Sequence, residues 1–196
     1  MSETETEKGG DAFARLLAAA GAQKGKPPVE RWNPPYCGEI GMRIAADGTW
    51  HYQGSPIGRK PLVKLFASIL RKDPERYVLV TPVERIGVEV EDAPFLAVEM
   101  ATEGEGDSRA ITFRTNVDDV VSVGPDNPLR FERDEKGGVK PYIRVRGDLW
   151  ALVTRSLMFD LVAMGEERIV EGRTVFGVAA GGAFHVVNGT GGVDDA

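Results

Sequence analysis

Residues 47–61, DGTWHYQGSPIGRKP, decide how the first half of this chain folds. The Asp47-Gly48 pair marks a tight hairpin turn, and Pro61 suits the first turn of a helix. Arg59 and Lys60 stand just before that helix, at the end that the helix macrodipole makes positive. A cation there is disfavoured by roughly 0.3–1 kcal/mol unless an anion lies beside it. The stretch therefore predicts a hairpin and then a helix, with a protein carboxylate or an anionic ligand near the start of the helix.

The alternation of apolar and polar residues selects the register of this hairpin. A two-residue loop would pair Ile44 with His51 and so mix polar and apolar side chains on both faces of the hairpin. A three-residue loop of residues 46–48 separates them, with Gly48 in the left-handed conformation. We expect this second register, which gives the pairs Ile44–Trp50, Arg43–His51 and Met42–Tyr52.

The residues after the hairpin predict one helix followed by strands. Apolar residues at helical spacing run from Leu62 to Leu70, and this stripe should pack on a sheet, burying Leu65, Phe66 and Ile69. Short alternating runs bounded by turn residues then predict four strands, at residues 75–82, 84–92, 94–102 and 109–115.

The second half repeats this order. It predicts a hairpin around Gly137-Gly138, and strands over residues 167–188 that turn at Glu171-Gly172 and Gly181-Gly182. Between them we expect a helix over residues 148–165, capped by Asp148, stopped by Gly165 and burying Leu152, Val153 and Leu157. The prediction is an α+β fold in which duplicated hairpin-helix-strand units form two small sheet-plus-helix domains.

Changes in amino-acid composition along the chain predict the domain boundaries. Residues 1–36 hold an acidic tail, a short helix signal with Asp11 as its N-cap and Gly21 as its stop, and a Pro-rich connector. Residues 37–93 form the predicted N-terminal α+β domain, residues 94–190 the C-terminal α+β domain, and residues 191–196 a flexible tail.

Composition excludes several classes of protein. The chain has 196 residues, 42% hydrophobic and 28% charged, which is typical of globular proteins. A net charge of -6 argues against bulk nucleic-acid binding, which depends on an excess of Lys and Arg. One cysteine, no secretory signal and no apolar run of 18 residues predict a cytoplasmic protein that does not enter the membrane.

Catalytic and metal-binding patterns are lacking in the sequence. The two histidines, His51 and His185, have no acidic or cysteine partner at ligand spacing, which argues against a metal site. Ser55 lies near His51, but no G-x-S-x-G motif surrounds it. We therefore assign no catalytic residue, no metal and no cofactor, and we expect a protein that is not an enzyme.

A basic stripe occupies the predicted strand at residues 140–146. Its alternate residues share one face, where arginines could hold phosphate oxygens and a tyrosine could stack on a base. The alternative is that these cations only pair with Glu132 and Asp134 across the hairpin, exposed and of little energetic weight. The residues of this stripe are Lys140, Tyr142, Arg144 and Arg146.

Both halves place arginines close to the start of a predicted helix, where backbone N–H groups are unpaired. Arg59 could therefore belong to an anion pocket, with Arg144 or Arg146 reaching the same ligand. It could equally form an ion pair with a carboxylate, for which the candidates are Glu84, Glu91 and Asp92.

The run from Gly48 to Phe95 resembles the core of an uncharacterised bacterial family, the domain of unknown function 1285. The shared residues are Trp50-x-Tyr52-x-Gly54-Ser55-Pro56-Ile57-x-Arg59, Leu65-Phe66, Thr81-Pro82 with Glu84, and VEDAPF at 90–95, with a weaker likeness through PYIRVRGDLWA at 141–151. The resemblance implies a duplicated two-domain architecture whose second domain is loosely similar to pleckstrin-homology folds. It also implies a ligand site at the domain interface, for a nucleotide-derived signal, and no established activity.

These observations lead us to expect a non-catalytic protein with a signalling or regulatory role. It should bind a small anionic, nucleotide-derived ligand at the interface of its domains. One alternative is a protein-interaction module that docks a partner or a second copy; another is an enzyme on a phosphorylated small molecule, with Glu84 and Asp92 as bases. The predicted ligand-binding residues are Arg59, Tyr142, Arg144, Arg146, Tyr52 and Glu84.

Overall fold

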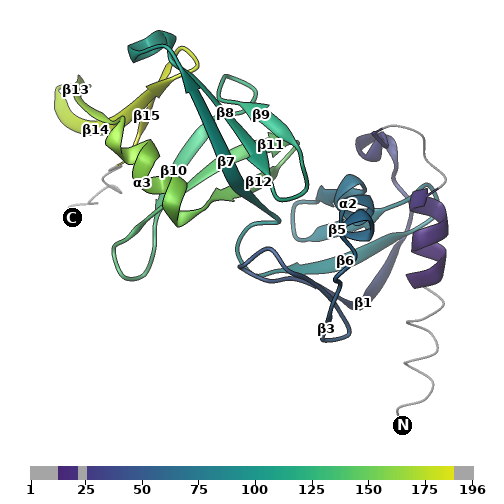
Figure 1. The fold of residues 1–196 in the computed structure, drawn as a ribbon. Coiled ribbons are helices and arrows are strands. Elements are labelled where there is room, and N and C mark those ends of the chain that lie inside the picture. The colour runs from purple at the N-terminus through teal and green to yellow at the C-terminus, as the bar shows by residue number, and fades with distance from the viewer. Residues whose placement is uncertain (1–12, 22–25, 188–196) are drawn as a thin grey trace, which may run out of the picture. The chain divides into compact units, whose positions relative to one another are not determined.

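The computed structural model describes residues 13–21 and 26–187. The chain divides into two compact units with the boundary between Pro94 and Phe95, and the division groups Gly147–Leu149 with the first unit. Each unit contains a six-stranded sheet, and the second unit also contains a three-stranded sheet (Figure 1). The protein is thus a mixed α+β protein of two units with few helices. The predicted acidic and C-terminal tails and the Asp11 cap lie outside the described residues.

The first unit is built from two three-stranded antiparallel meanders. They join through the parallel pairing of β1 with β6, so the strand order is β3-β2-β1-β6-β5-β4. Helix α2 connects the two meanders along the chain. The elements are η1 (Val29–Arg31), β1 (Tyr36–Ile44), β2 (Trp50–Tyr52), β3 (Ser55–Pro56), α2 (Lys60–Ser68), β4 (Leu70–Lys72), β5 (Tyr77–Val80) and β6 (Arg85–Val90).

The predicted register of the first hairpin is confirmed. β1 pairs with β2 at Met42–Tyr52, Arg43–His51 and Ile44–Trp50, and Gly48 has a φ of 81°. This register places Met42, Ile44 and Trp50 in the core, where all three are buried. The alternation of side chains along the strands was therefore enough to choose the loop length.

Helix α2 is shorter than predicted. It ends at Ser68, and Leu70 starts β4, pairing with Leu79 of β5. Phe66 and Ile69 are fully buried as expected, whereas Leu65 is half-buried. Because the stripe of apolar residues continues into the strand without a break, periodicity alone did not show where the helix stops.

A further short helix spans residues 13–21 and is called the N-terminal helix below (Figure 1). The short helix predicted from the sequence is therefore present. Leu16 and Ala20 on one side of it are buried, and Ala14, Arg15 and Ala18 are exposed. This helix is amphipathic and contributes to the core of the first unit.

The second unit repeats the pair of meanders and adds a small three-stranded antiparallel sheet. Its large sheet has the order β10-β11-β12-β7-β8-β9, with β7 parallel to β12, and its small sheet has the order β13-β14-β15. The elements are β7 (Phe95–Glu103), η2 (Gly106–Ser108), β8 (Ala110–Thr115), β9 (Val120–Ser122), β10 (Leu129–Arg133), β11 (Val139–Arg146), β12 (Leu149–Val153), α3 (Arg155–Ala163), β13 (Glu166–Val170), β14 (Arg173–Ala180) and β15 (Ala183–Val186).

The helix predicted for residues 148–165 is wrong in its first half. Leu149–Val153 form strand β12 in the middle of the large sheet, and α3 covers only Arg155–Ala163. Asp148 is therefore not a helix cap. Burial alternates along β12, with Val153 buried and Leu152 half-buried, but a run of apolar residues hides this alternation in the sequence.

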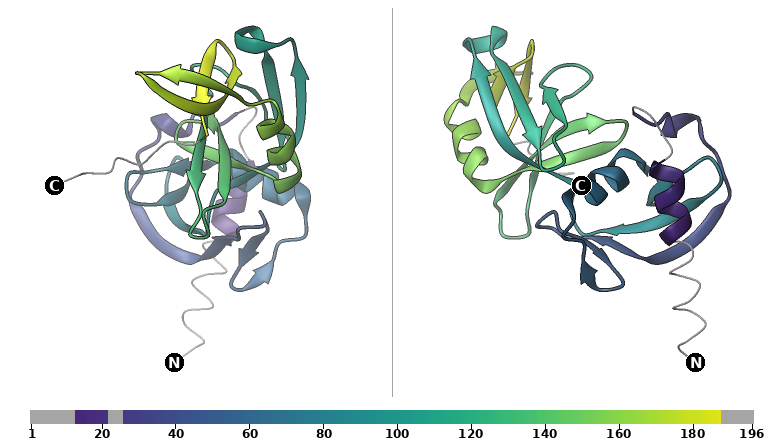
Figure 2. Two further views of the ribbon diagram at one scale, coloured as in Figure 1. Left: turned by 90° about the vertical axis from the view of Figure 1, so that its left-hand side faces the viewer. Right: turned by 45° about the vertical axis from the view of Figure 1, so that its right-hand side comes forward.

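The element that repeats is the sheet, and not the predicted hairpin-helix-strand unit. Each large sheet joins two meanders through a parallel pair in its centre. The strands of this pair are the first and last of the sheet along the chain: β1 with β6, and β7 with β12. The helices occupy different places, because α2 connects the meanders of the first unit and α3 follows those of the second (Figure 2). Among the described residues, no helix is long and apolar enough to cross a membrane.

Candidate functional site

The six predicted ligand-binding residues lie three in each unit. Arg59, Tyr52 and Glu84 belong to the first unit, and Tyr142, Arg144 and Arg146 to the second. That both sets reach one ligand at a domain interface stays a prediction. Each set is therefore considered with its own neighbours.

Arg59 is exposed at the N-cap position of α2 and is extended there. It makes no ion pair with any residue in the described part of the chain. Two of its candidate partners bind elsewhere: Glu84 lies 3.8 Å from Arg15, and Glu91 forms an ion pair with Arg43. Within the described residues, no carboxylate is therefore paired with Arg59 at the positive end of the helix.

Tyr52 and Glu84 are covered by the N-terminal helix. The Tyr52 ring stacks on Phe13 at 4.3 Å, and burial raises the pKa of Tyr52. Glu84 is only 6% exposed, and its backbone N–H donates to the Thr81 hydroxyl at 3.2 Å. The Tyr52 hydroxyl and Glu84 Oε1 are buried without a hydrogen-bond partner among the described residues.

In the second unit, the side chain of Tyr142 is part of the core. It is 4% exposed and lies beneath the guanidinium of Arg130, which also covers Trp150 at 4.1 Å. In the register of β10 and β11, Lys140 is opposite Glu132, in agreement with the cross-strand alternative. These positions leave little of Tyr142 for stacking on a ligand.

Arg146 already has a protein carboxylate beside it. Its guanidinium lies 2.6 Å from Asp119 Oδ2 and 5.2 Å from the centre of the Phe95 ring. The carbonyl oxygen of Arg144 accepts a hydrogen bond from Asn127 at 2.8 Å. An anion at Arg146 would have to compete with Asp119 for the same donors.

The first unit also contains a pocket that the sequence did not reveal. Its volume is about 300 Å³, and it lies where the first residues of β1 and β6 meet the turn between β4 and β5. The residues that line it are Tyr36, Asp73, Pro74, Glu75, Arg76 and Arg85.

A carboxylate held by two arginines forms one side of this pocket. Arg71 Nε and Arg85 Nη1 donate to the two oxygens of Asp73, at 2.7 and 2.9 Å. Arg71 also donates to the carbonyl oxygens of Val29 and Trp32, both at 2.7 Å. Burial opposes ionisation of Asp73, but the hydrogen bonds and charges of the two arginines outweigh it and lower its pKa. Asp73 therefore stays anionic and fixes Arg85 in place.

The other side of the pocket carries a cation above an aromatic ring. The guanidinium of Arg76 lies 4.5 Å from the centre of the Tyr36 ring, and its interaction with the Tyr36 hydroxyl raises the pKa of Arg76. Gly87 lies close by, because a Cβ there would stand 2.7 Å from the Tyr36 hydroxyl. The glycine lets Tyr36 cross β6 and reach the pocket.

This arrangement can hold an anion. Arg76 and Arg85 both line the pocket and are partly exposed, and the ion pair of Arg76 with the exposed Glu75 is long, at 3.4 Å. Arginine donors match the oxygens of phosphate and carboxylate groups. No histidine, cysteine or serine lines the pocket, and the described residues contain no group of three or more metal-ligating side chains.

The fold defines a class of two-domain α+β proteins in which each domain is built on a six-stranded sheet of paired meanders. The chain belongs to the DUF1285 family: the model of its N-terminal domain, a domain of unknown function, matches residues 27–93, and that of its C-terminal domain matches residues 94–187. None of the curated proteins compared with the chain matches it.

Two solved structures are similar to this chain. A DUF1285 family protein from Silicibacter pomeroyi DSS-3 is 46% identical, with a TM-score of 0.80, over 88% of this chain and 93% of its own. A DUF1285 family protein from Shewanella baltica OS155 is 27% identical, with a TM-score of 0.52, over 64% of this chain and 92% of its own. The first of them agrees with the two-domain α+β organisation.

Proposed function

We propose that this protein is a non-catalytic binding protein for a small anionic ligand. The observation that carries the proposal is the pocket of the first unit, where Arg76 and Arg85 face the same cavity of about 300 Å³. A cavity of this size suits a small molecule. Its lining includes no histidine, cysteine or serine, and its Asp73 carboxylate is held by Arg71 and Arg85, which supports binding rather than catalysis.

Charge at this place differs from that of the chain as a whole. The lining carries two positive charges, on Arg76 and Arg85, and two negative charges, on Asp73 and Glu75, and Arg71 outside the lining also binds Asp73. The pocket is therefore balanced in charge within a chain of net charge -6, and the partly exposed guanidinium of Arg76 supports an anion there. Tyr36 adds an aromatic ring, which supports a ligand with both a flat ring and an anionic group, as in a nucleotide.

Several finer predictions remain part of this proposal. They are the ligand site between the domains, the role in signalling, the location in the cytoplasm and the loose likeness of the second domain to pleckstrin-homology folds. The six residues predicted from the sequence and the pocket of the first unit offer two different places for the anion, and one experiment can separate them.

The test is a thermal-shift titration with inorganic phosphate, pyrophosphate and nucleoside phosphates. A ligand that binds only the native state raises the apparent melting temperature. We expect at least one of these anions to stabilise the wild-type chain, and Arg76→Ala to remove most of that shift. Arg133→Ala, which removes an exposed arginine of β10, is the matched control and should keep the full shift.

Three further variants locate the site. If Arg59→Ala, Arg144→Ala and Arg146→Ala lose the shift while Arg76→Ala keeps it, the ligand binds at the sequence-predicted residues and not in the pocket. An equal shift in Arg76→Ala and wild type would likewise contradict the pocket. No shift with any anion would contradict anion binding as the function.

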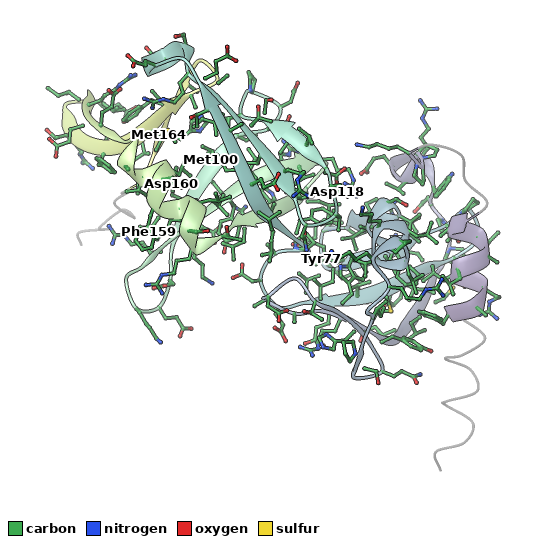
Figure 3. The ribbon with its side chains drawn as sticks, in the orientation of Figure 1. Tyr77, Met100, Asp118, Phe159, Asp160 and Met164 are labelled. Atoms are coloured by element: carbon green, nitrogen blue, oxygen red, sulfur yellow. The ribbon has the colours of Figure 1, made fainter. Side chains whose placement is uncertain are left out.

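The alternative function, protein interaction, is favoured by apolar side chains exposed on the second unit. Phe159 on α3 is 58% exposed and Ile169 on β13 is 78% exposed. Figure 3 labels Phe159 and Asp160 on α3, Met164 just after the helix, and Met100 on β7, a strand that α3 contacts. Light scattering tests the simplest case, in which the partner is a second copy of the chain. A wild-type dimer that becomes a monomer in the double variant Phe159→Ser, Ile169→Thr would favour this function.

A further inference from the structure

The N-terminal helix lies outside the part of the chain that the family models match. These models start at residue 27, whereas the helix spans residues 13–21. The helix nevertheless packs on core residues that lie within the matched part. The surface that it covers therefore lies within the matched domain, whereas the helix lies outside the part that the family models match.

The contacts of the helix are those of a docked amphipathic peptide. The ring of Phe13 stacks on Tyr52 at 4.3 Å and lies 5.5 Å from Phe66 of α2. Arg15 Nε approaches Glu84 Oε2 to 3.8 Å. Leu16 and Ala20, one and two turns further along, are buried. An aromatic anchor, a basic residue and a stripe of apolar residues are the means by which helices are held in helix-binding surfaces.

The surface beneath the N-terminal helix keeps two buried polar atoms without hydrogen bonds. Tyr52 and Glu84 both contact the helix, yet the Tyr52 hydroxyl and Glu84 Oε1 are buried with no hydrogen-bond partner among the described residues. Buried polar atoms without partners disfavour a bound state relative to one that supplies the missing hydrogen bonds. A helix with a polar side chain in reach of these atoms would bind this surface better.

We propose that Tyr52, Phe66 and Glu84 form a docking face for an amphipathic helix of a partner protein, and that the N-terminal helix occupies this face in cis. The partner helix carries an aromatic residue, a basic residue two positions later, and apolar residues three and seven positions later. The N-terminal helix competes with the partner helix for the docking face at an effective concentration of the order of millimolar. The partner therefore binds strongly only when the N-terminal helix has left the docking face. This inference is independent of the anion pocket.

The test uses the full chain and a fluorescent peptide with the sequence of residues 11–23. Leu16→Ala in the chain weakens the helix in cis and leaves the docking face intact. We expect fluorescence anisotropy to show that this variant binds the peptide at least tenfold more tightly than the wild-type chain does. The matched control, Ala18→Ser, changes an exposed residue of the same helix and should bind the peptide as the wild type does.

A charge-reversed peptide and amide hydrogen exchange give two further tests. A peptide with Arg15→Glu should bind the Leu16→Ala chain at least tenfold more weakly than the original peptide, because it faces Glu84. In the wild-type chain, amides of residues 13–21 should exchange with solvent well before those of β6, because the helix leaves while the sheet stays folded.

Three results would overturn the proposal. The first is a folded Leu16→Ala chain that does not bind the peptide in a saturable manner. The second is equal binding of the Arg15→Glu peptide. The third is a dimer in which two chains exchange their helices and the peptide does not bind, which would make a second copy the occupant in place of a partner protein.

Discussion

Asp73 is a carboxylate held between the guanidinium groups of Arg71 and Arg85. Removing its charge leaves Arg71, which is almost buried, without its carboxylate and with only two carbonyl oxygens as acceptors. We expect Asp73→Asn to lower the free energy of unfolding by about 3 kcal/mol at pH 7, the cost of breaking a buried pair. Urea unfolding measures this loss.

The pH dependence of that loss follows from the lowered pKa of Asp73. A carboxylate whose pKa is lower in the folded state stabilises the fold above its ordinary value of 3.8, and this contribution disappears as the pH falls through the lowered value. The difference between wild type and Asp73→Asn should therefore persist at pH 5 and shrink below about pH 4. Glu75→Gln, which changes an 82% exposed carboxylate of the same pocket, should have little effect at any pH. A similar loss in both variants would contradict the network.

At the scale of the element, the N-cap of helix α2 is a cation, Arg59, that forms no ion pair with any residue that the structure describes. Arg59→Ala should therefore leave the free energy of unfolding unchanged or raise it by no more than about 0.5 kcal/mol, because it removes a charge from the positive end of the helix. Arg59→Lys keeps the charge and should match the wild type. A clear loss of stability in Arg59→Ala, restored in part by Glu84→Gln, would show that Arg59 is an ion-pair partner after all.

The turn between β14 and β15 offers a matched pair of glycines. Both Gly181 and Gly182 have positive φ, so alanine at either is strained by about 1–2 kcal/mol. A Cβ at Gly181 would also stand 2.3 Å from the carbonyl oxygen of Val123, whereas a Cβ at Gly182 meets nothing within 4 Å. Gly181→Ala should hence cost at least about 1 kcal/mol more than Gly182→Ala in chemical unfolding. Equal costs would show that this turn is not packed on Val123, the residue after β9.

For the whole molecule, each unit has its own core, with Phe66 fully buried in the first and Phe113 in the second. Phe66→Ala and Phe113→Ala should each cost about 3–5 kcal/mol. Hydrogen exchange should show the loss of protection mainly in the unit that carries the substitution. Val83→Ala, at an exposed residue, is the control. Loss of protection spread evenly over both units would mean that the molecule unfolds as one cooperative body.

The sequence by itself determined the elements whose signals are local. Alternation of side chains chose the register of the first hairpin, and turn residues marked most of the strands. The resemblance to the DUF1285 family, confirmed by the family models, added the two-domain organisation. These features depend on neighbouring residues or on a pattern that persists along the chain, so they can be recognised before the chain is folded.

Only the tertiary structure decided the position of β12 and the composition of the pocket. The run Leu149–Val153 is apolar throughout, so only its place in the centre of a sheet makes it a strand. Asp73 meets Arg85 across 12 positions of the chain, and Arg71 reaches the backbone of Val29 and Trp32 across 42 and 39 positions. Which charge neutralises which is set by where the strands place the side chains, because an ion pair needs proximity in space and leaves no periodic signal in the sequence.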